Sequence, residues 1–285
     1  MGDIQQDSSL VSIGIPVHNG DRSIEDVLIM ISTQTHRNLE IIISDNASDD
    51  RTEKICRQFA EIDSRIRFYR HYKLMSAADN FRFVFEKSTA DFFMWACDDD
   101  KWSLNYIEEC LRSLQARADA AGVLGRVTSN LNFTSRQLGG EPIEGNTAYE
   151  RFREAIIEAN GNSRLFSLFK RSAMSNVYPI GQPYLGADWF MVAMIAAEGK
   201  IIRTQNECEF CKCSAGGESS NVTQLFLPLK VSNWEFIVPY YQLMKACSRT
   251  SYNSLRLQFD LICKSMIFSL RLLRDFLSSN FYKNR

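Results

Sequence analysis

The sequence lacks several features that would assign it to a broad class at once. No uninterrupted apolar run reaches the length of a membrane span. The polar, acidic segment 1–7 has neither the basic region nor the apolar region of a signal peptide. The formal net charge of -1 provides no basic excess, so no nucleic acid is expected as a partner. We therefore expect a cytoplasmic protein.

Histidine is scarce, and this limits the metal chemistry that the cysteines can support. The three histidines all lie far upstream of the cluster Cys208-x-x-Cys211-x-Cys213. A zinc site needs a fourth ligand at suitable spacing, and none is evident here. We expect the eight cysteines to be reduced thiols and this cluster to be part of a strand or loop.

Strand and helix patterns alternate through the first two thirds of the chain. Strand-like apolar runs occupy 10–15, 39–43, 66–69, 92–96, 121–127, 164–170 and 201–202. Helical spacing occurs over 24–31, 50–62 and 80–87, from about 103, from 187 to Gly199, and again from about 225. The polar segment 128–160 is expected to be a loop. Strands separated by helices predict βαβ units and an α/β fold with a mainly parallel sheet.

Polar clusters follow three of the predicted strands. These are Pro16-Val17-His18-Asn19, Asp45-Asn46 and Asp98-Asp99-Asp100. In open parallel sheets ligands bind beyond the carboxyl ends of the strands, so the clusters are expected to converge on one active site. Three adjacent carboxylates repel each other unless a cation offsets them, and Mg²⁺ or Mn²⁺ prefers such oxygen ligands. The alternative is an acidic loop that caps the next helix.

These motifs, in this order, resemble the inverting glycosyltransferases of family 2, which have the GT-A fold. The resemblance covers about residues 10–205. It is carried by 15–19, by the segment Ser32-Thr33-Gln34-Thr35 with Glu40, by 45–52, by the Asp98–Asp100 triplet and by Asp188. Asn46 departs from the family pattern because it stands where a second Asp is usual, and the turn before Asn80 lacks the usual glycine.

The resemblance implies a role for each site residue. Asp100 would hold Mn²⁺ or Mg²⁺, and Asp98 would reach the metal or the donor ribose. Asp188 would be the general base that takes a proton from the acceptor hydroxyl; its alternative is an N-cap.

The remaining donor contacts are also implied by the resemblance. Asp45 would accept a hydrogen bond from the base, and Pro16 and Asn19 would shape the base and ribose pocket. Asn80 would contact the donor or, alternatively, cap its helix. Helix capping and turn formation are the alternatives for Asp45 and for Pro16 with Asn19, respectively.

The implied function is transfer of a sugar from a nucleoside diphosphate donor, with a UDP-sugar favoured, to a glycan or lipid-linked acceptor. Surface or extracellular polysaccharide synthesis is the expected setting. A sugar nucleotidyltransferase of similar fold and a catalytically silent nucleotide-sugar-binding protein are the alternatives. The first strand is followed by a turn with one glycine, Gly20, which argues against the glycine-rich phosphate loop of a nucleotidyltransferase.

Two regions are predicted: a GT-A domain over residues 8–222 and a helical C-terminal region over 223–285. The latter carries a broad apolar surface between Leu261 and Leu277, with basic residues interspersed. It is expected to pack on the catalytic domain, to join a second subunit in a homo-oligomer, or to lie on the inner face of the membrane, where lipid-linked acceptors reside.

Overall fold

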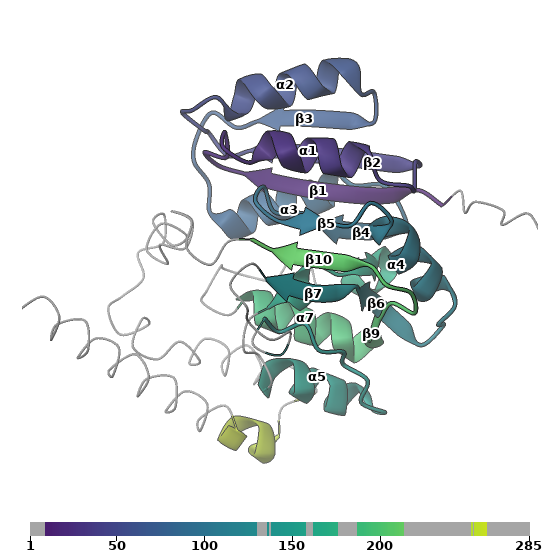
Figure 1. The fold of residues 1–285 in the computed structure, drawn as a ribbon. Helices are drawn as coiled ribbons and strands as arrows, with labels where there is room; N and C mark the ends of the chain where they lie inside the picture. Colours follow the sequence, from purple (N-terminus) through teal and green to yellow (C-terminus); the bar gives the residue numbers. More distant parts are fainter. Residues whose placement is uncertain are drawn as a thin grey trace, which may run out of the picture.

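A seven-stranded sheet with the order β3-β2-β1-β4-β8-β6-β9 forms the centre of the computed structural model (Figure 1). The structure describes residues 9–129, 136, 138–157, 162–175, 187–213, 252 and 254–260. The strands are β1 Val11–Val17, β2 Leu39–Asp45, β3 Ile66–Arg70, β4 Phe92–Trp95, β6 Ala120–Leu124, β8 Leu168–Lys170 and β9 Lys200–Arg203. β8 runs antiparallel to both of its neighbours, and the other pairs are parallel. The mainly parallel sheet is therefore confirmed.

Helices cover both faces of this sheet (Figure 1). They are α1 Ile24–Ser32, α2 Thr52–Ile62, α3 Ala77–Lys87, α4 Tyr106–Gln115, α5 Ala148–Ile157, α6 Arg171–Ser175 and α7 Ala187–Glu198. α1 packs on α2, α3 packs on β1 and β2, α4 and α7 pack on β6, and α5 packs on α7. β1, β2 and β3 each lead into a helix that returns over the sheet, and β4 and β6 run in the same direction as these strands, so the carboxyl ends of all five share one edge.

A second, three-stranded sheet joins the acid cluster to a distant part of the chain. It consists of β5 (Lys101–Trp102), β10 (Glu209–Lys212) and β7 (Arg126–Ser129), with β10 in the middle. Trp102 and Phe210 stack with their ring centroids 5.6 Å apart, which anchors β5 on β10. The cysteine-rich segment is thus a strand, one of the two expected forms, and it lies directly beside the residues that follow Asp100.

The expectation of a loop over 128–160 is wrong, because the segment contains α5. Its residues Phe152, Ala155 and Ile156 are buried against the rest of the core. The predicted strand 164–170 is also partly wrong: it begins as a 3-10 turn, Ser163–Phe166, before β8. In that turn Arg164 is buried and its Nε donates to the Glu141 carbonyl oxygen.

The described residues of the C-terminal region, 252 and 254–260, pack on α5. The ring of Tyr252 stacks on Phe152 at 4.9 Å, and Arg153 pairs with Asp260 at 2.5 Å. The apolar surface predicted between 261 and 277, and the predicted boundary at 222–223, lie outside the described residues.

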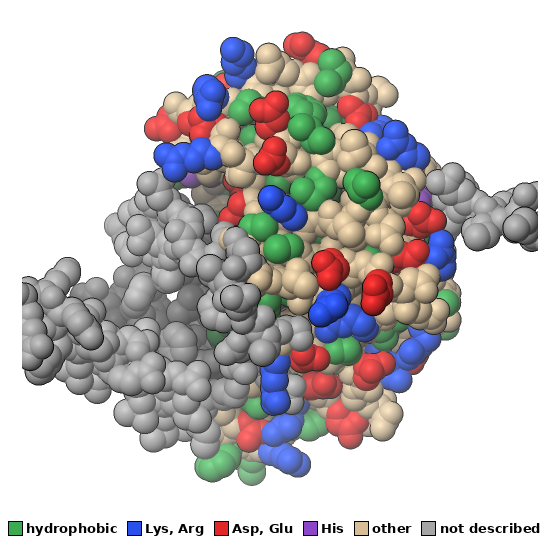
Figure 2. All heavy atoms as spheres, in the orientation of Figure 1, with side chains coloured by type: hydrophobic (Ala, Val, Ile, Leu, Met, Phe, Trp, Pro, Cys, Tyr) green, Lys and Arg blue, Asp and Glu red, His purple; other side chains and the backbone are tan. Residues whose placement is uncertain are grey.

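Charges of both signs are interspersed over the face shown in Figure 2. This distribution is unlike the single-signed surface that binds a polyanion. Within the described ranges, no helix is both long and apolar enough to span a bilayer.

Candidate active site

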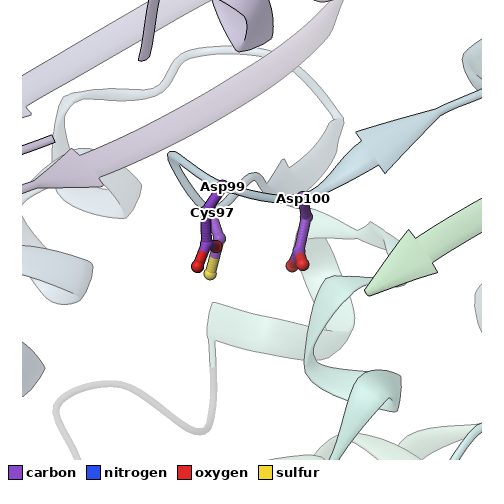
Figure 3. A group of neighbouring side chains, drawn as sticks. All are labelled: Cys97, Asp99 and Asp100. Atoms are coloured by element: carbon purple, nitrogen blue, oxygen red, sulfur yellow. The ribbon is translucent and has the colours of Figure 1, made fainter. Parts of the chain in front are cut away.

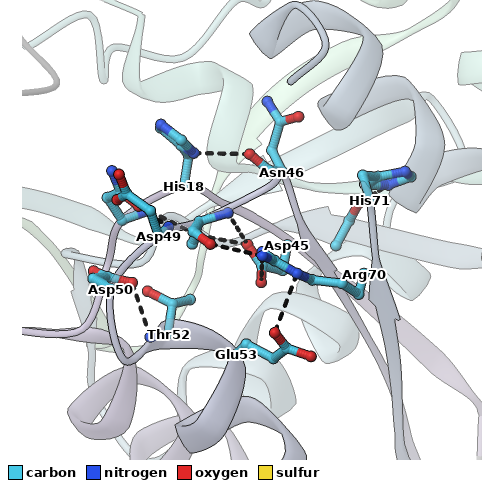
Figure 4. A network of polar contacts seen from close by, with 12 residues as sticks. His18, Asp45, Asn46, Asp49, Asp50, Thr52, Glu53, Arg70 and His71 are labelled. Atoms are coloured by element: carbon cyan, nitrogen blue, oxygen red, sulfur yellow. Dashed lines mark hydrogen bonds and ion pairs between the residues drawn. The ribbon is translucent and has the colours of Figure 1, made fainter. Parts of the chain in front are cut away.

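Asp45 is the most enclosed acidic residue at the carboxyl edge of the sheet. Its side chain is fully buried, and one carboxylate oxygen accepts hydrogen bonds from the Ser48 backbone N–H at 3.0 Å and the Ser48 hydroxyl at 2.5 Å. The other oxygen pairs with Arg70 Nη1 at 2.6 Å (Figure 4). Arg70 ends β3 in register with Asp45, so the parallel pairing of β2 and β3 brings the two charges together. Its guanidinium offsets the charge that Asp45 would otherwise bury alone.

The turns after β1 and β2 are joined by hydrogen bonds. Asn19 has a positive φ of 54°, its backbone N–H donates to the Ser48 hydroxyl at 2.9 Å, and its side-chain oxygen accepts from the Asp49 N–H at 2.9 Å. An asparagine tolerates this left-handed conformation better than most residues. Pro16 lies inside β1, buried opposite Ser44, and is therefore not a turn residue.

Asn80 does not cap its helix, so that alternative is wrong. The cap of α3 is Ser76, whose hydroxyl accepts from the Asp79 N–H at 3.1 Å. Asn80 is buried one turn into the helix, where its side-chain oxygen accepts from the Ser44 hydroxyl at 2.5 Å and its nitrogen donates to the Ser44 carbonyl at 3.1 Å. These two hydrogen bonds therefore attach α3 to the end of β2.

The acidic side chains after β4 point in two different directions. The Asp98 carboxylate lies against the β1 turn, where a Cβ built on Gly20 would come within 2.4 Å of Asp98 Oδ2. The side chains of Cys97, Asp99 and Asp100 point together to one side of the loop, and their ligand atoms all lie within 4.8 Å of one another (Figure 3). Asp99 and Cys97 were not among the predicted metal ligands, although Asp99 stands within the motif that predicted the site.

Crowding of these carboxylates changes how readily they ionise. Burial, reinforced by the nearby Asp99 charge, raises the pKa of Asp98 to about 7. Burial and Asp99 likewise raise the pKa of Asp100 to about 7, against the opposing effects of Lys212 and of the Cys213 N–H, which donates to Asp100 at 3.1 Å. A bound cation would favour the ionised forms and displace the protons.

Asp188 lies in the first turn of α7, at the same edge of the sheet, because α7 precedes the parallel strand β9. The Asn162 side-chain nitrogen donates to Asp188 Oδ2 at 2.9 Å. Burial raises the pKa of Asp188, whereas Asn162 and the Lys212 charge oppose that rise. A carboxylate with a raised pKa and a fixed orientation has the properties of a general base.

Shared electrostatic partners show that the acidic residues form one group. Burial raises the pKa of Cys56 to about 12, and the charges of Asp45, Asp50 and Asp98 act in the same direction, so those carboxylates lie near a single thiol. The Lys212 charge in turn opposes the rise in the pKa of both Asp100 and Asp188. The predicted residues thus gather at one edge. Lys212 and Asn162 reach the site from other segments of the chain, and no motif in the sequence pointed to them.

Comparisons with known proteins assign the chain to a family. The profile of the family described as "Glycosyl transferase family 2" matches residues 12–177. The chain belongs to glycosyl transferase family 2.

Family 2 relatives match only parts of their own length. TuaG of Bacillus subtilis, a glycosyltransferase whose name assigns it provisionally to teichuronic acid biosynthesis, is 30% identical over 116 residues, 41% of this chain and 46% of TuaG. The GalNAc(5)-diNAcBac-PP-undecaprenol beta-1,3-glucosyltransferase of Campylobacter jejuni is 25% identical over 171 residues, 58% of this chain and 53% of the relative. The chain therefore spans about half the length of these curated relatives.

Solved structures of glycosyltransferases share the fold. S. aureus TarS 1-349 in complex with UDP-GlcNAc matches with a TM-score of 0.59 at 13% identity, over 88% of this chain and 78% of TarS 1-349. The mannosyltransferase PcManGT of Pyrobaculum calidifontis, in complex with GDP-Man and Mn²⁺, matches with a TM-score of 0.59 at 16% identity, over 92% of this chain and 72% of that protein. The expected GT-A fold is confirmed.

Proposed function

We propose that this family 2 protein is a metal-dependent, inverting glycosyltransferase. It moves a sugar from a nucleoside diphosphate donor, with UDP favoured, to a hydroxyl of a glycan or lipid-linked acceptor in polysaccharide synthesis. The observation that carries the proposal is the gathering of Asp45, the Asp98–Asp100 triplet and Asp188 at one edge of the sheet. The UDP-GlcNAc bound by TarS and the undecaprenol-linked acceptor in the name of the Campylobacter enzyme support the donor and acceptor classes.

The acid cluster fits a divalent cation. Two carboxylates and a thiol present ligand atoms within 4.8 Å of one another, and oxygen ligands suit Mg²⁺ and Mn²⁺. Asp100 and Asp99 would hold the ion, while Asp98, turned toward the β1 turn, would reach the ribose. When bound, the ion supplies Lewis-acid stabilisation of the charge on the departing diphosphate.

Asp188 performs the proton transfer. The acceptor oxygen attacks the anomeric carbon, the bond from that carbon to the diphosphate oxygen breaks, and the bonding electrons leave with the diphosphate. Asp188 removes the hydroxyl proton during the attack, held in orientation by Asn162. A single displacement inverts the configuration at the anomeric carbon. Lys212 favours the ionised form of Asp188 that the base requires.

Donor binding and metal dependence can be tested together by thermal shift. UDP, GDP, CDP and ADP are each added with Mn²⁺ or with EDTA, because a ligand of the native state raises the unfolding temperature. We expect UDP with Mn²⁺ to give the largest shift and UDP-sugars to release UDP slowly by hydrolysis. The proposal is wrong if no nucleoside diphosphate shifts the transition, or if pyrophosphate-dependent chemistry or binding without turnover is found instead.

A further inference from the structure

Asn46 connects three segments at the edge where the donor would bind. Its backbone N–H donates to the Val17 carbonyl oxygen at 2.8 Å, which ties it to the end of β1. Its carbonyl oxygen accepts from His18 Nδ1 at 2.8 Å (Figure 4). Its side chain reaches the turn before α3, where the Met75 N–H donates to Asn46 Oδ1 at 2.9 Å and Asn46 Nδ2 donates to the Met75 carbonyl oxygen at 3.0 Å.

The pair of bonds to Met75 requires an amide. One partner atom of the turn is a donor and the other is an acceptor, and an asparagine side chain offers one group of each kind. An ionised aspartate has only acceptors, so it would keep the bond to the N–H and set a charged oxygen against the Met75 carbonyl. Asn46 is only 4% exposed, so water does not readily replace the lost donor.

The turn 72–76 carries side chains suited to a nucleotide. We call the two hydrogen bonds between Asn46 and Met75 the latch, and the turn that they hold the latched turn. It is anchored at one end by the His71 N–H, which donates to the Asp45 carbonyl oxygen at 2.9 Å, and at the other end by Met75. Tyr72, Lys73 and Leu74 lie exposed between these anchors, beside Asp45. An exposed aromatic ring can stack on a base, and an ammonium group can pair with a phosphate.

We propose that Asn46 is a positioning residue that holds the turn 72–76 as one wall of the donor site, and that an amide is required there. This inference rests on the proposed function for its consequence, donor binding, but not for the latch itself. If the protein binds donor only while the latch is formed, the apparent dissociation constant for the donor is inversely proportional to the fraction of molecules in which the latch is formed.

Substitution of Asn46 by aspartate gives a pH-dependent test. A protonated carboxyl group offers one O–H donor and one carbonyl acceptor, so it restores both bonds to Met75. Asn46→Asp should bind UDP with Mn²⁺ roughly tenfold to a hundredfold more weakly than the wild type at pH 8. It should approach wild-type affinity near pH 5.5, whereas Asn46→Ala should be weak at both values.

Other titrating groups near position 46 must be separated from this effect. They are His18 on the β1 turn, Asp45 with its partner Arg70, and His71 at the end of β3, whose pKa is lowered by burial. All of them are present in every variant, so each affinity is divided by the wild-type affinity at the same pH. Asn105→Asp is the matched control, because Asn105 Nδ2 also donates to a backbone carbonyl, that of Glu207, at 3.2 Å.

The control residue lies away from the site. Leu104, beside it, accepts from the Thr35 N–H, and Thr35 precedes β2 and so lies at the opposite edge of the sheet. Asn105→Asp should bind UDP as the wild type does at both pH values. Circular dichroism and the thermal transition of each variant establish that it is folded.

The rate of amide hydrogen exchange in the peptide containing residues 72–76 measures how firmly the turn is held, and it requires no nucleotide. Exchange should be faster than in the wild type in Asn46→Ala at both pH values, and in Asn46→Asp at pH 8 only. Wild-type affinity of Asn46→Asp at pH 8, or no recovery at pH 5.5, overturns the inference. If the wild type binds no nucleoside diphosphate but the exchange pattern holds, the proposed function fails and the latch stands.

Discussion

Replacing Asp100 by asparagine should stabilise the protein when no metal is present. The side chain is 1% exposed, and burial with the Asp99 charge raises its pKa to about 7 from 3.8. The native state therefore binds more protons than the unfolded state between about pH 4 and pH 7. The contribution of Asp100 to the free energy of unfolding is therefore largest below this pH window. It falls as pH rises through the window, because the buried carboxyl group must ionise. An asparagine keeps the acceptor for the Cys213 N–H without the charge.

The magnitude follows from the pKa change. A shift from 3.8 to about 7 corresponds to about 4 kcal/mol at roughly 1.36 kcal/mol per unit. Asp98 has a pKa raised to about 7 by burial and the same neighbour, and removal of one charge also relieves the other. Part of the repulsion remains between Asp98 and Asp99, so we expect Asp100→Asn to gain about 2 kcal/mol at pH 8 in EDTA, half of the full value.

Urea denaturation at pH 4.5 and pH 8 measures this difference, with and without Mn²⁺. In EDTA the gain of Asp100→Asn over the wild type should be largest at pH 8 and small at pH 4.5. Mn²⁺ should stabilise the wild type and not the variant. Asp119→Asn is a control of opposite sign, because hydrogen bonds from Arg117 and Lys200 lower the pKa of that exposed carboxyl group. A variant less stable than the wild type at pH 8 in EDTA would refute the reasoning.

Three further substitutions test separate parts of the site. Asp188→Asn should keep the thermal shift given by UDP with Mn²⁺ and lose roughly 10²-fold to 10⁴-fold in transfer rate; a normal rate would show that Asp188 is not the base. Arg70→Met should lower the free energy of unfolding by about 3 kcal/mol in urea, because Asp45 would be buried without its partner, and a loss within error would contradict this. Asp99→Asn should abolish the Mn²⁺-dependent part of the UDP shift; an unchanged dependence would exclude Asp99 as a ligand.

The sequence predicted a mainly parallel sheet because the strands have strong local signals. Apolar, β-branched runs such as 39–43 are buried on both faces, and polar residues mark where they end. The rule that parallel strands share a carboxyl edge then placed Asp45 and the acid triplet together. The same rule could have placed Arg70 beside Asp45, because Arg70 ends the neighbouring strand in register with Asp45.

The missed features depend on contacts between distant segments. α5 lies in a polar stretch of the sequence. Its apolar residues Phe152, Ala155 and Ile156 are buried where α5 packs on α7, a helix that the local sequence does not reveal as its partner. The choice among three successive aspartates depends on the backbone of a short irregular loop, which directs Asp98 toward Gly20 and Asp99 away from it. No periodicity in the sequence encodes such directions.

The two halves of the edge differ in how their charges are balanced. On the β2 side, the Asp45 charge is matched by Arg70 and by Ser48, so that half is fixed before any ligand arrives. On the β4 side, the carboxylates lie close to one another, and the nearby Lys212 charge only limits the rise in the pKa of Asp100. A diphosphate alone would add to this repulsion, and a divalent cation alone would lack part of its ligand shell. Under the proposed function, the cation would offset the charge of the diphosphate and the diphosphate would complete the ligand shell of the cation, so we expect this edge to bind them as a pair.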